Sequence, residues 1–267
     1  MPFLKLKTAE IYYEVAGETG AWLTFVCGLT RTLADFKNYS RRFVAEGYRV
    51  LLFDNRGAGQ TKWNPDFSIE EMTEDIQALW DHLKISQSIL IGFSLGGQIA
   101  IQSAMRFSNR IRAMVLISSS IYPEYVNTQV LRDMEGTDEQ LEACIRLFFS
   151  EKYRDKHLLF ISAFAKKIIR EHYRSEVEQG AVAQRKALQA AQGKAELSHL
   201  YVPVLLAHGT EDFIVKVESS RRAHAEMPHS QFTEFEHAGH MLLVEEPEKL
   251  FSLILDFLNH VSRLAVQ

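Results

Sequence analysis

The chain has 267 residues, 46% of them hydrophobic, which is enough for one large buried core rather than two independent domains. Its 30 basic and 34 acidic residues give a formal net charge of -4 with the signs interspersed, so the composition predicts no nucleic-acid partner. The N-terminal segment lacks a secretory-signal pattern, and no apolar run approaches the roughly 20 residues that span a bilayer. We therefore expect a cytoplasmic protein without membrane contact. The sequence does not decide between a monomer and a dimer.

The two cysteines, Cys27 and Cys144, are too few for a disulfide framework. Their spacing relative to the histidines does not suggest a zinc site. We expect both thiols to be reduced and structural, and we expect no metal.

Strand and helix patterns alternate over most of the chain. Residues 3–7 and 10–15 alternate apolar and polar side chains before a turn, which predicts an antiparallel strand pair. Residues 69–83 have helical periodicity, with Ser68 and Glu71 in a capping-box pattern. Short apolar runs typical of strands buried on both faces occupy residues 23–27, 50–53, 88–93, 114–117 and 204–207. This alternation predicts the α/β class, with a mostly parallel sheet covered by helices on both faces.

The alternation stops between about residues 121 and 199, where apolar residues at helical spacing predict a helical insertion. Strand and helix then resume, with residues 231–235 as the last strand and 247–261 as the closing helix. We therefore expect a core of residues 1–120 and 200–267 and a separate helical unit of residues 121–199.

A glycine-flanked serine lies between a predicted strand and a predicted helix. The segment GFSLG spans residues 92–96 with Ser94 at its centre. A turn this sharp strains the serine backbone and exposes its hydroxyl at the carboxyl edge of the sheet. The helix beginning at Leu95 places free N–H groups and the positive end of its dipole beside that hydroxyl. The pattern predicts a nucleophile; the alternative is a glycine-rich turn with a solvent-facing serine.

A serine nucleophile needs a base, usually an imidazole oriented by a carboxylate. The segment HGTEDFIV follows a predicted strand and offers Glu211 and Asp212 as acids. The segment FEHAGHM follows the next strand and offers His237 and His240, while His208 is a third imidazole. The order serine, acid, histidine occurs in strand–loop enzymes of this kind, but the residues alone leave both choices open.

These motifs resemble those of the α/β-hydrolase family, and the resemblance covers nearly the whole chain. HGTEDFIV is similar to its HGxxDxxV segment, and HAGHMLLVEEPEKL to its GHxxxxExPxxL segment. The resemblance implies a central sheet of about eight strands, a cap formed by the insertion, Ser94 as nucleophile, Asp212 as acid and His240 as base. It makes His208 a structural residue. GFSLGG is similar to the 3-oxoadipate enol-lactonase, non-haem peroxidase-like and small carboxylesterase branches.

The resemblance also implies an oxyanion hole formed by the backbone N–H groups of Leu29 and Leu95. The family usually has His-Gly-x before the first donor, but here Cys27 replaces the histidine that braces the loop. A cysteine ending an apolar strand is typical of a buried filler, and a second nucleophile is the alternative.

The segment DNRGAGQT resembles the family's DxRGxGxS loop, in which Asp54 and Arg56 would fasten loops. No nucleotide-binding pattern is present, so we expect no cofactor.

Aromatic residues recur at helical spacing in the insertion. We expect Phe148, Phe149, Phe160 and Phe164 to line an apolar pocket over Ser94. The alternative is that they pack the cap helices together and onto the core.

The leading hypothesis is a serine hydrolase acting on a small carboxylic ester or lactone. A serine in place of aspartate in the elbow argues against haloalkane dehalogenase and epoxide hydrolase chemistry. One alternative is a ligand-binding or signalling protein that retains the triad, and another is a catalytically inactive scaffold. A third is a carbon–carbon bond hydrolase, which requires an anion-binding residue that the sequence does not place.

Overall fold

The computed structural model describes residues 2–64, 66–119, 121–134, 136–172, 175–191 and 196–264. The predicted core and insertion also contain residues 1, 65, 120, 135, 173–174, 192–195 and 265–267, which lie outside the described residues.

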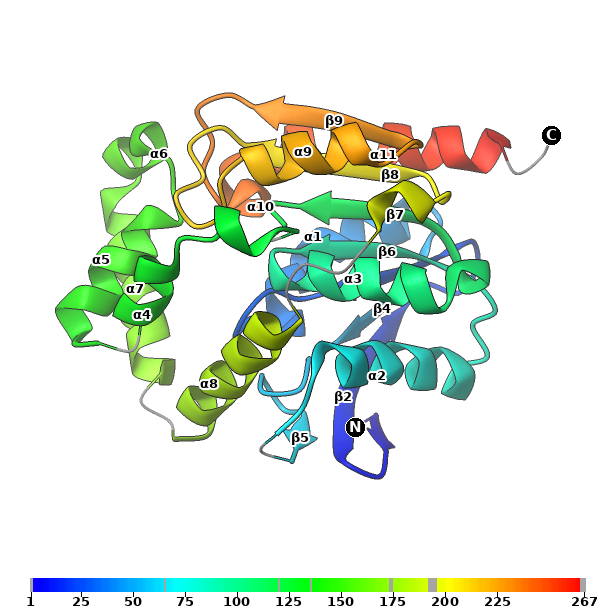
Figure 1. Cartoon of the computed structure of the whole chain (residues 1–267), viewed down its shortest axis with the longest axis horizontal. Coiled ribbons are helices and arrows are strands. Elements are labelled where there is room, and N and C mark those ends of the chain that lie inside the picture. The colour runs from blue at the N-terminus through cyan, green and yellow to red at the C-terminus, as the bar shows by residue number, and fades with distance from the viewer. Residues whose placement is uncertain are drawn as a thin grey trace.

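A nine-stranded sheet forms the centre of the molecule, with the order β1-β2-β4-β3-β6-β7-β8-β9 and β5 beside β2 (Figure 1). The pairs from β4 through β3 to β9 are parallel, whereas β2 pairs antiparallel with β1, β4 and β5. The α/β class, the mostly parallel sheet and the N-terminal antiparallel pair are thus confirmed. The strands are β1 (Phe3–Lys5), β2 (Ala9–Ala16), β3 (Trp22–Val26), β4 (Arg49–Phe53), β5 (Lys62–Trp63), β6 (Ser88–Phe93), β7 (Ile111–Ile117), β8 (Val204–Gly209) and β9 (Ser230–Phe235).

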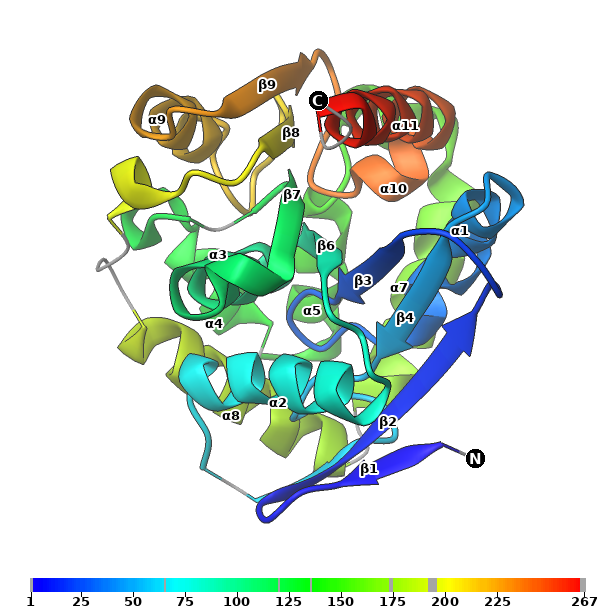
Figure 2. The ribbon, with the colours of Figure 1, turned by 90° about the vertical axis from the view of Figure 1, so that its right-hand side faces the viewer.

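Helices cover both faces of this sheet (Figure 2). One face carries α1 (Leu33–Ala45) and α11 (Pro247–Leu264). The other carries α2 (Ile69–His82), α3 (Leu95–Arg106) and α9 (Glu218–Glu226). Ser68 and Glu71 form both hydrogen bonds of the capping box predicted before α2. Within the described part of the chain, no helix combines the length and apolarity needed to cross a membrane.

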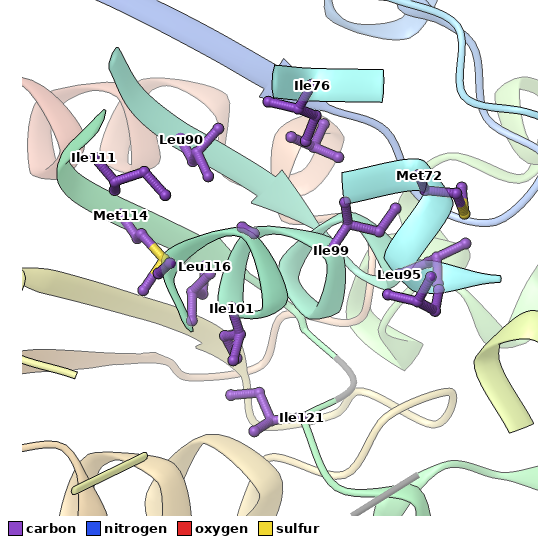
Figure 3. Close-up of a cluster of buried hydrophobic side chains, with 14 of the residues drawn as sticks. Met72, Ile76, Leu90, Leu95, Ile99, Ile101, Ile111, Met114, Leu116 and Ile121 are labelled. Carbon is purple, nitrogen blue, oxygen red and sulfur yellow. The ribbon is translucent and has the colours of Figure 1, made fainter. Parts of the chain in front are cut away.

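Side chains of each central strand alternate between two hydrophobic cores. In β6, Leu90 packs on the side of α2 and α3, whereas Ile89 and Ile91 pack on the side of α1 and α11. Figure 3 shows the first core, where Leu90 and Met114 of the sheet lie beside α2 and α3. This double burial is why the central strands are continuous apolar runs in the sequence.

The helices between β7 and β8, which we call the cap helices, lie beyond the carboxyl ends of the strands. In Figure 1 the arrowheads of β7 and β9 point toward them. They are α4 (Thr128–Asp133), α5 (Asp138–Leu147), α6 (Glu151–Lys156), α7 (Leu158–His172) and α8 (Ser175–Ala190). The sequence between β9 and α11 adds α10 (Leu242–Glu245). Loops at the carboxyl edge of the sheet are therefore covered by the cap.

A buried ion pair ties the loop after β4 to α2. Arg56 donates two hydrogen bonds to Asp75, of 2.6 Å from Nε and 2.8 Å from Nη2. Both side chains are almost completely buried. Removing one partner of such a pair leaves a charge without compensation in a medium of low dielectric constant.

We predict that Asp75→Ala lowers the free energy of unfolding by about 3 kcal/mol, because Arg56 remains buried without its main partner. Urea denaturation monitored by circular dichroism measures this change. Glu74→Ala is the matched control, since Glu74 pairs with Arg106 at the surface and its loss costs about 0.5 kcal/mol. Equal effects of the two substitutions would contradict the prediction.

Candidate active site

Ser94 occupies the sharp turn between β6 and α3. Its backbone is left-handed, with φ 53° and ψ -116°, and its N–H donates to the carbonyl of Ile117 at 2.9 Å. A Cβ on Gly96 would lie only 2.0 Å from the carbonyl oxygen of Val26, so the turn requires glycine there. The strain is held by close packing of β3, β6 and α3, and it leaves the Ser94 side chain partly exposed at the edge of the sheet.

Asp212 and His240 follow the neighbouring parallel strands β8 and β9 and meet at the same edge. His240 Nδ1 lies 2.7 Å from Asp212 Oδ2, and both side chains are buried. Because a carboxylate can only accept, Nδ1 carries the proton and Nε2 is left as the basic nitrogen. The His240 ring also lies 5.1 Å from the ring of Phe93, the residue before Ser94.

The Asp212 carboxylate is surrounded by donors. Its Oδ1 accepts from the backbone N–H groups of Ile214 and Val215, each at 2.9 Å, and its Oδ2 also accepts from His208 Nε2 at 3.1 Å. Burial alone would raise the pKa of Asp212, but the facing imidazole of His240 and the hydrogen bonds from both histidines hold that pKa well below its ordinary value. Asp212 therefore stays ionised and orients His240.

The competing residues have other partners. His208 Nε2 faces two acceptors, Asp212 and the carbonyl of Val215, while its Nδ1 lies 2.7 Å from Ser220 Oγ. Its ring is fully buried in these contacts, which suit a structural role. Glu211 and His237 pair with each other at 3.0 Å, and the His237 side chain is largely exposed. The imidazole of His240 instead donates its hydrogen bond to Asp212.

Ser94, Leu95, Leu29 and His240 all line one cavity between the core and the cap helices, whose volume is about 760 Å³ including its mouth. Among the described wall residues, Arg31 is the only lysine, arginine, aspartate or glutamate, and its Nη2 is 2.6 Å from Asp35. The other wall residues are almost all apolar: Thr30, Phe93, Val126, Leu131, Met134, Ile145, Phe148, Phe164, Ile168, Leu188, Ile214, Val215 and Met241.

The four phenylalanines expected in the pocket divide into two pairs. Phe148 and Phe164 lie on the cavity wall. Phe149 is instead completely buried, stacked on Tyr153 with ring centroids 5.5 Å apart, and Phe160 is 44% exposed. The expectation is corrected for Phe149 and Phe160, because spacing along a helix does not reveal which side faces the cavity. Most other wall residues come from separate segments and carried no common sequence signal.

Hydrogen bonds from residues after β4 hold the loop after β3 in place. Asn55 Nδ2 donates to the carbonyl of Cys27 at 2.9 Å, and Asp54 Oδ1 accepts from the N–H of Leu33 at 2.8 Å. The Cys27 thiol is buried against the carbonyl of Phe53, and burial raises its pKa well above the ordinary value. It stays protonated at neutral pH and does not line the cavity, so a nucleophilic role does not fit.

Comparisons with known proteins identify the family. The sequence model of the alpha/beta hydrolase fold matches residues 27–247. The chain belongs to the α/β-hydrolase family. AB hydrolase superfamily protein YisY of Bacillus subtilis is 26% identical to this hydrolase, over 95% of the chain and 98% of the relative.

Solved structures share the same fold. The enol-lactonase of Burkholderia xenovorans LB400 superposes with a TM-score of 0.83 at 23% identity, covering 97% of this hydrolase and 100% of the lactonase. Est816, an N-acyl homoserine lactone degrading enzyme, gives a TM-score of 0.84 at 21% identity, covering 96% and 100% of the two chains. Other similar proteins include esterases and meta-cleavage product hydrolases.

Among the described residues, no group of three or more His, Cys, Asp or Glu side chains could hold a metal ion.

We predict that Asp212→Asn lowers kcat for p-nitrophenyl butanoate by about 10⁴-fold, because an amide stabilises the wrong tautomer of His240. Steady-state kinetics measure the loss. Glu211→Gln is the adjacent control and should leave kcat within about twofold, since Glu211 pairs with His237 at the surface. A larger loss from Glu211→Gln than from Asp212→Asn would identify Glu211 as the acid.

Proposed function

We propose that this hydrolase cleaves a carboxylic ester or lactone through an acyl-enzyme on Ser94. The observation that carries the proposal is that Ser94, in its strained turn, and His240, which is paired with Asp212, line the same cavity. The family supplies the general activity, hydrolysis, and the contacts described above support the assignment of these residues. The chemistry needs no cofactor, and a small uncharged molecule is the partner that the cavity suits.

In the first step, Ser94 Oγ attacks the substrate carbonyl carbon while His240 Nε2 takes its proton. The carbonyl oxygen becomes an oxyanion that accepts hydrogen bonds from the N–H groups of Leu29 and Leu95. Leu95 is the first residue of α3, so its N–H has no partner within the helix. The tetrahedral intermediate collapses as His240 returns the proton to the leaving alkoxide, and Asp212 stabilises the transient imidazolium.

In the second step, water attacks the acyl-enzyme along the same path. His240 takes a proton from the water, and the Ser94 oxygen leaves and recovers that proton as the acid is released. In a lactone both products remain one molecule, a hydroxy acid.

The cavity wall favours an uncharged, apolar substrate. Its phenylalanine, leucine, isoleucine and methionine side chains offer few polar partners. Arg31 is largely neutralised by Asp35, and its guanidinium lies 5.4 Å from the ring centroid of Phe164. A substrate carboxylate would have to compete with Asp35 for Arg31, which weighs against the anionic substrates that a carbon–carbon bond hydrolase would require.

We predict that Ser94→Ala lowers kcat for p-nitrophenyl butanoate by about 10⁶-fold, because the triad acts as a unit. The thermal midpoint should remain near that of the wild type. Ser103→Ala is the matched control in the same helix, since its hydroxyl bonds only the carbonyl of Ile99. Multiple turnovers by the wild type support an enzyme, whereas one slow covalent event per molecule would indicate a ligand-binding protein.

We also predict that kcat/KM rises with acyl length from acetate to hexanoate, by up to about fourfold per methylene buried. Phe164→Ala should reduce this gain, while Phe160→Ala should not, because only Phe164 lies on the cavity wall. The p-nitrophenyl monoester of succinate should be a poorer substrate than the butanoate. A preference for the charged ester would contradict the apolar assignment and indicate that Arg31 binds carboxylates.

A further inference from the structure

A glutamine of the cap touches the loop that carries one of the proposed oxyanion donors. Gln184 lies in α8 and its side chain is completely buried. Its Oε1 accepts from the backbone N–H of Thr30 at 2.7 Å, and its Nε2 donates to the carbonyl of Arg56 at 2.7 Å. Both ends of the amide are therefore used, one on each of two core loops.

The loop is one that needs such support. Gly28 and Arg31 form a turn closed by a 3.1 Å bond from the Arg31 N–H to the Gly28 carbonyl. Thr30 within it is left-handed, with φ 59°, which is unfavourable for a β-branched residue. Such a conformation persists where surrounding contacts fix it, and the Gln184 bond is made to the N–H of this strained residue.

Leu29 is bracketed by two fixed groups. On one side the carbonyl of Cys27 is held by Asn55 at 2.9 Å, and on the other the N–H of Thr30 is held by Gln184 at 2.7 Å. The Cys27 side chain itself makes only a long thiol contact of 3.8 Å to the carbonyl of Phe53. The firm restraints on this loop therefore come from the β4 loop and from the cap.

The backbone of α8 also touches the core directly. A Cβ on Gly180 would lie 2.0 Å from the carbonyl oxygen of Gly57, so the helix can approach this closely only with glycine there. Gly57 follows Arg56, whose carbonyl accepts the hydrogen bond from Gln184 Nε2. The close packing of α8 against the core therefore also fixes the position of Gln184.

We infer that Gln184 is a positioning residue for the oxyanion hole, which holds the Leu29 N–H in place and makes the hole depend on docked α8. The inference rests on the proposed function. A misplacement of about 1 Å at a reacting centre can cost about 100-fold in rate, and a lost oxyanion donor costs a similar factor or more. The cost should fall on kcat, because the hole is engaged in the transition state rather than in substrate binding.

The test is Gln184→Met, which keeps the side-chain length and removes both hydrogen bonds. We expect kcat for p-nitrophenyl butanoate to fall about 10- to 100-fold, with KM changed by less than about threefold. Ala187→Gly is the matched control, because it weakens the same helix without touching Thr30. It should lower the thermal midpoint but leave kcat within about twofold.

An unchanged kcat in folded Gln184→Met, a loss confined to KM, or an equal loss of kcat in Ala187→Gly would overturn the inference. If Gln184→Met fails to fold, Gly180→Ala replaces it, because the added methyl pushes α8 and Gln184 away from the core. The same selective loss of kcat is then expected, and unchanged kcat would overturn the inference.

A second readout separates this inference from the proposed function. An alkyl fluorophosphonate reacts once with Ser94: the Oγ–P bond forms, fluoride leaves, and His240 accepts the serine proton. Its P=O oxygen uses the same hole, so Gln184→Met should slow labelling by a similar factor. Labelling without ester or lactone turnover in the wild type would reject the proposed function only. Equal labelling rates in the wild type and Gln184→Met would reject the positioning role only.

Discussion

The left-handed backbone of Ser94 is the constraint on which the rest of the site depends. It exists because β6 must pass directly into α3, with Gly96 packed against the Val26 carbonyl of β3. A side chain at position 96 would separate β3 from α3 and relax the turn. The same parallel strands bring the loops after β3, β8 and β9 to this edge, so the sheet determines where Ser94, the Asp212–His240 pair and the proposed oxyanion donors lie.

The cap is fastened to the core at both sides of this edge. On the histidine side, the N–H of Met241 donates to the carbonyl of Phe148 at 3.1 Å, and the Phe148 ring lies 5.5 Å from that of His240. On the oxyanion side, Gln184 holds Thr30. The cap therefore contributes more than a cover for the cavity, since the loops that carry His240 and the proposed oxyanion donor Leu29 each donate a backbone hydrogen bond to it. Pocket shape and catalytic geometry are coupled through these contacts.

Charge is used differently in the two buried polar sites. Asp212 receives four donors and faces an imidazole, so its charge is held where His240 can use it. Arg56 and Asp75 neutralise each other away from the cavity and hold a loop to α2. The described wall of the cavity carries little net charge, since Arg31 is paired with Asp35. This separation suits the apolar substrate proposed above, because the ionised Asp212 does not line the cavity.

The sequence by itself determined the α/β class, the strand–helix alternation and the local environment of Ser94, because these depend on periodicity and on residues adjacent in the chain. The family motifs also favoured Asp212 and His240 over Glu211 and His237. Only the tertiary structure decided which aromatic side chains face the cavity, placing Phe164 on its wall, because walls are assembled from distant segments. The contact between Gln184 and Thr30 was equally absent from the sequence patterns. It joins residues 154 positions apart, and its geometry exists only once α8 is seated on the core.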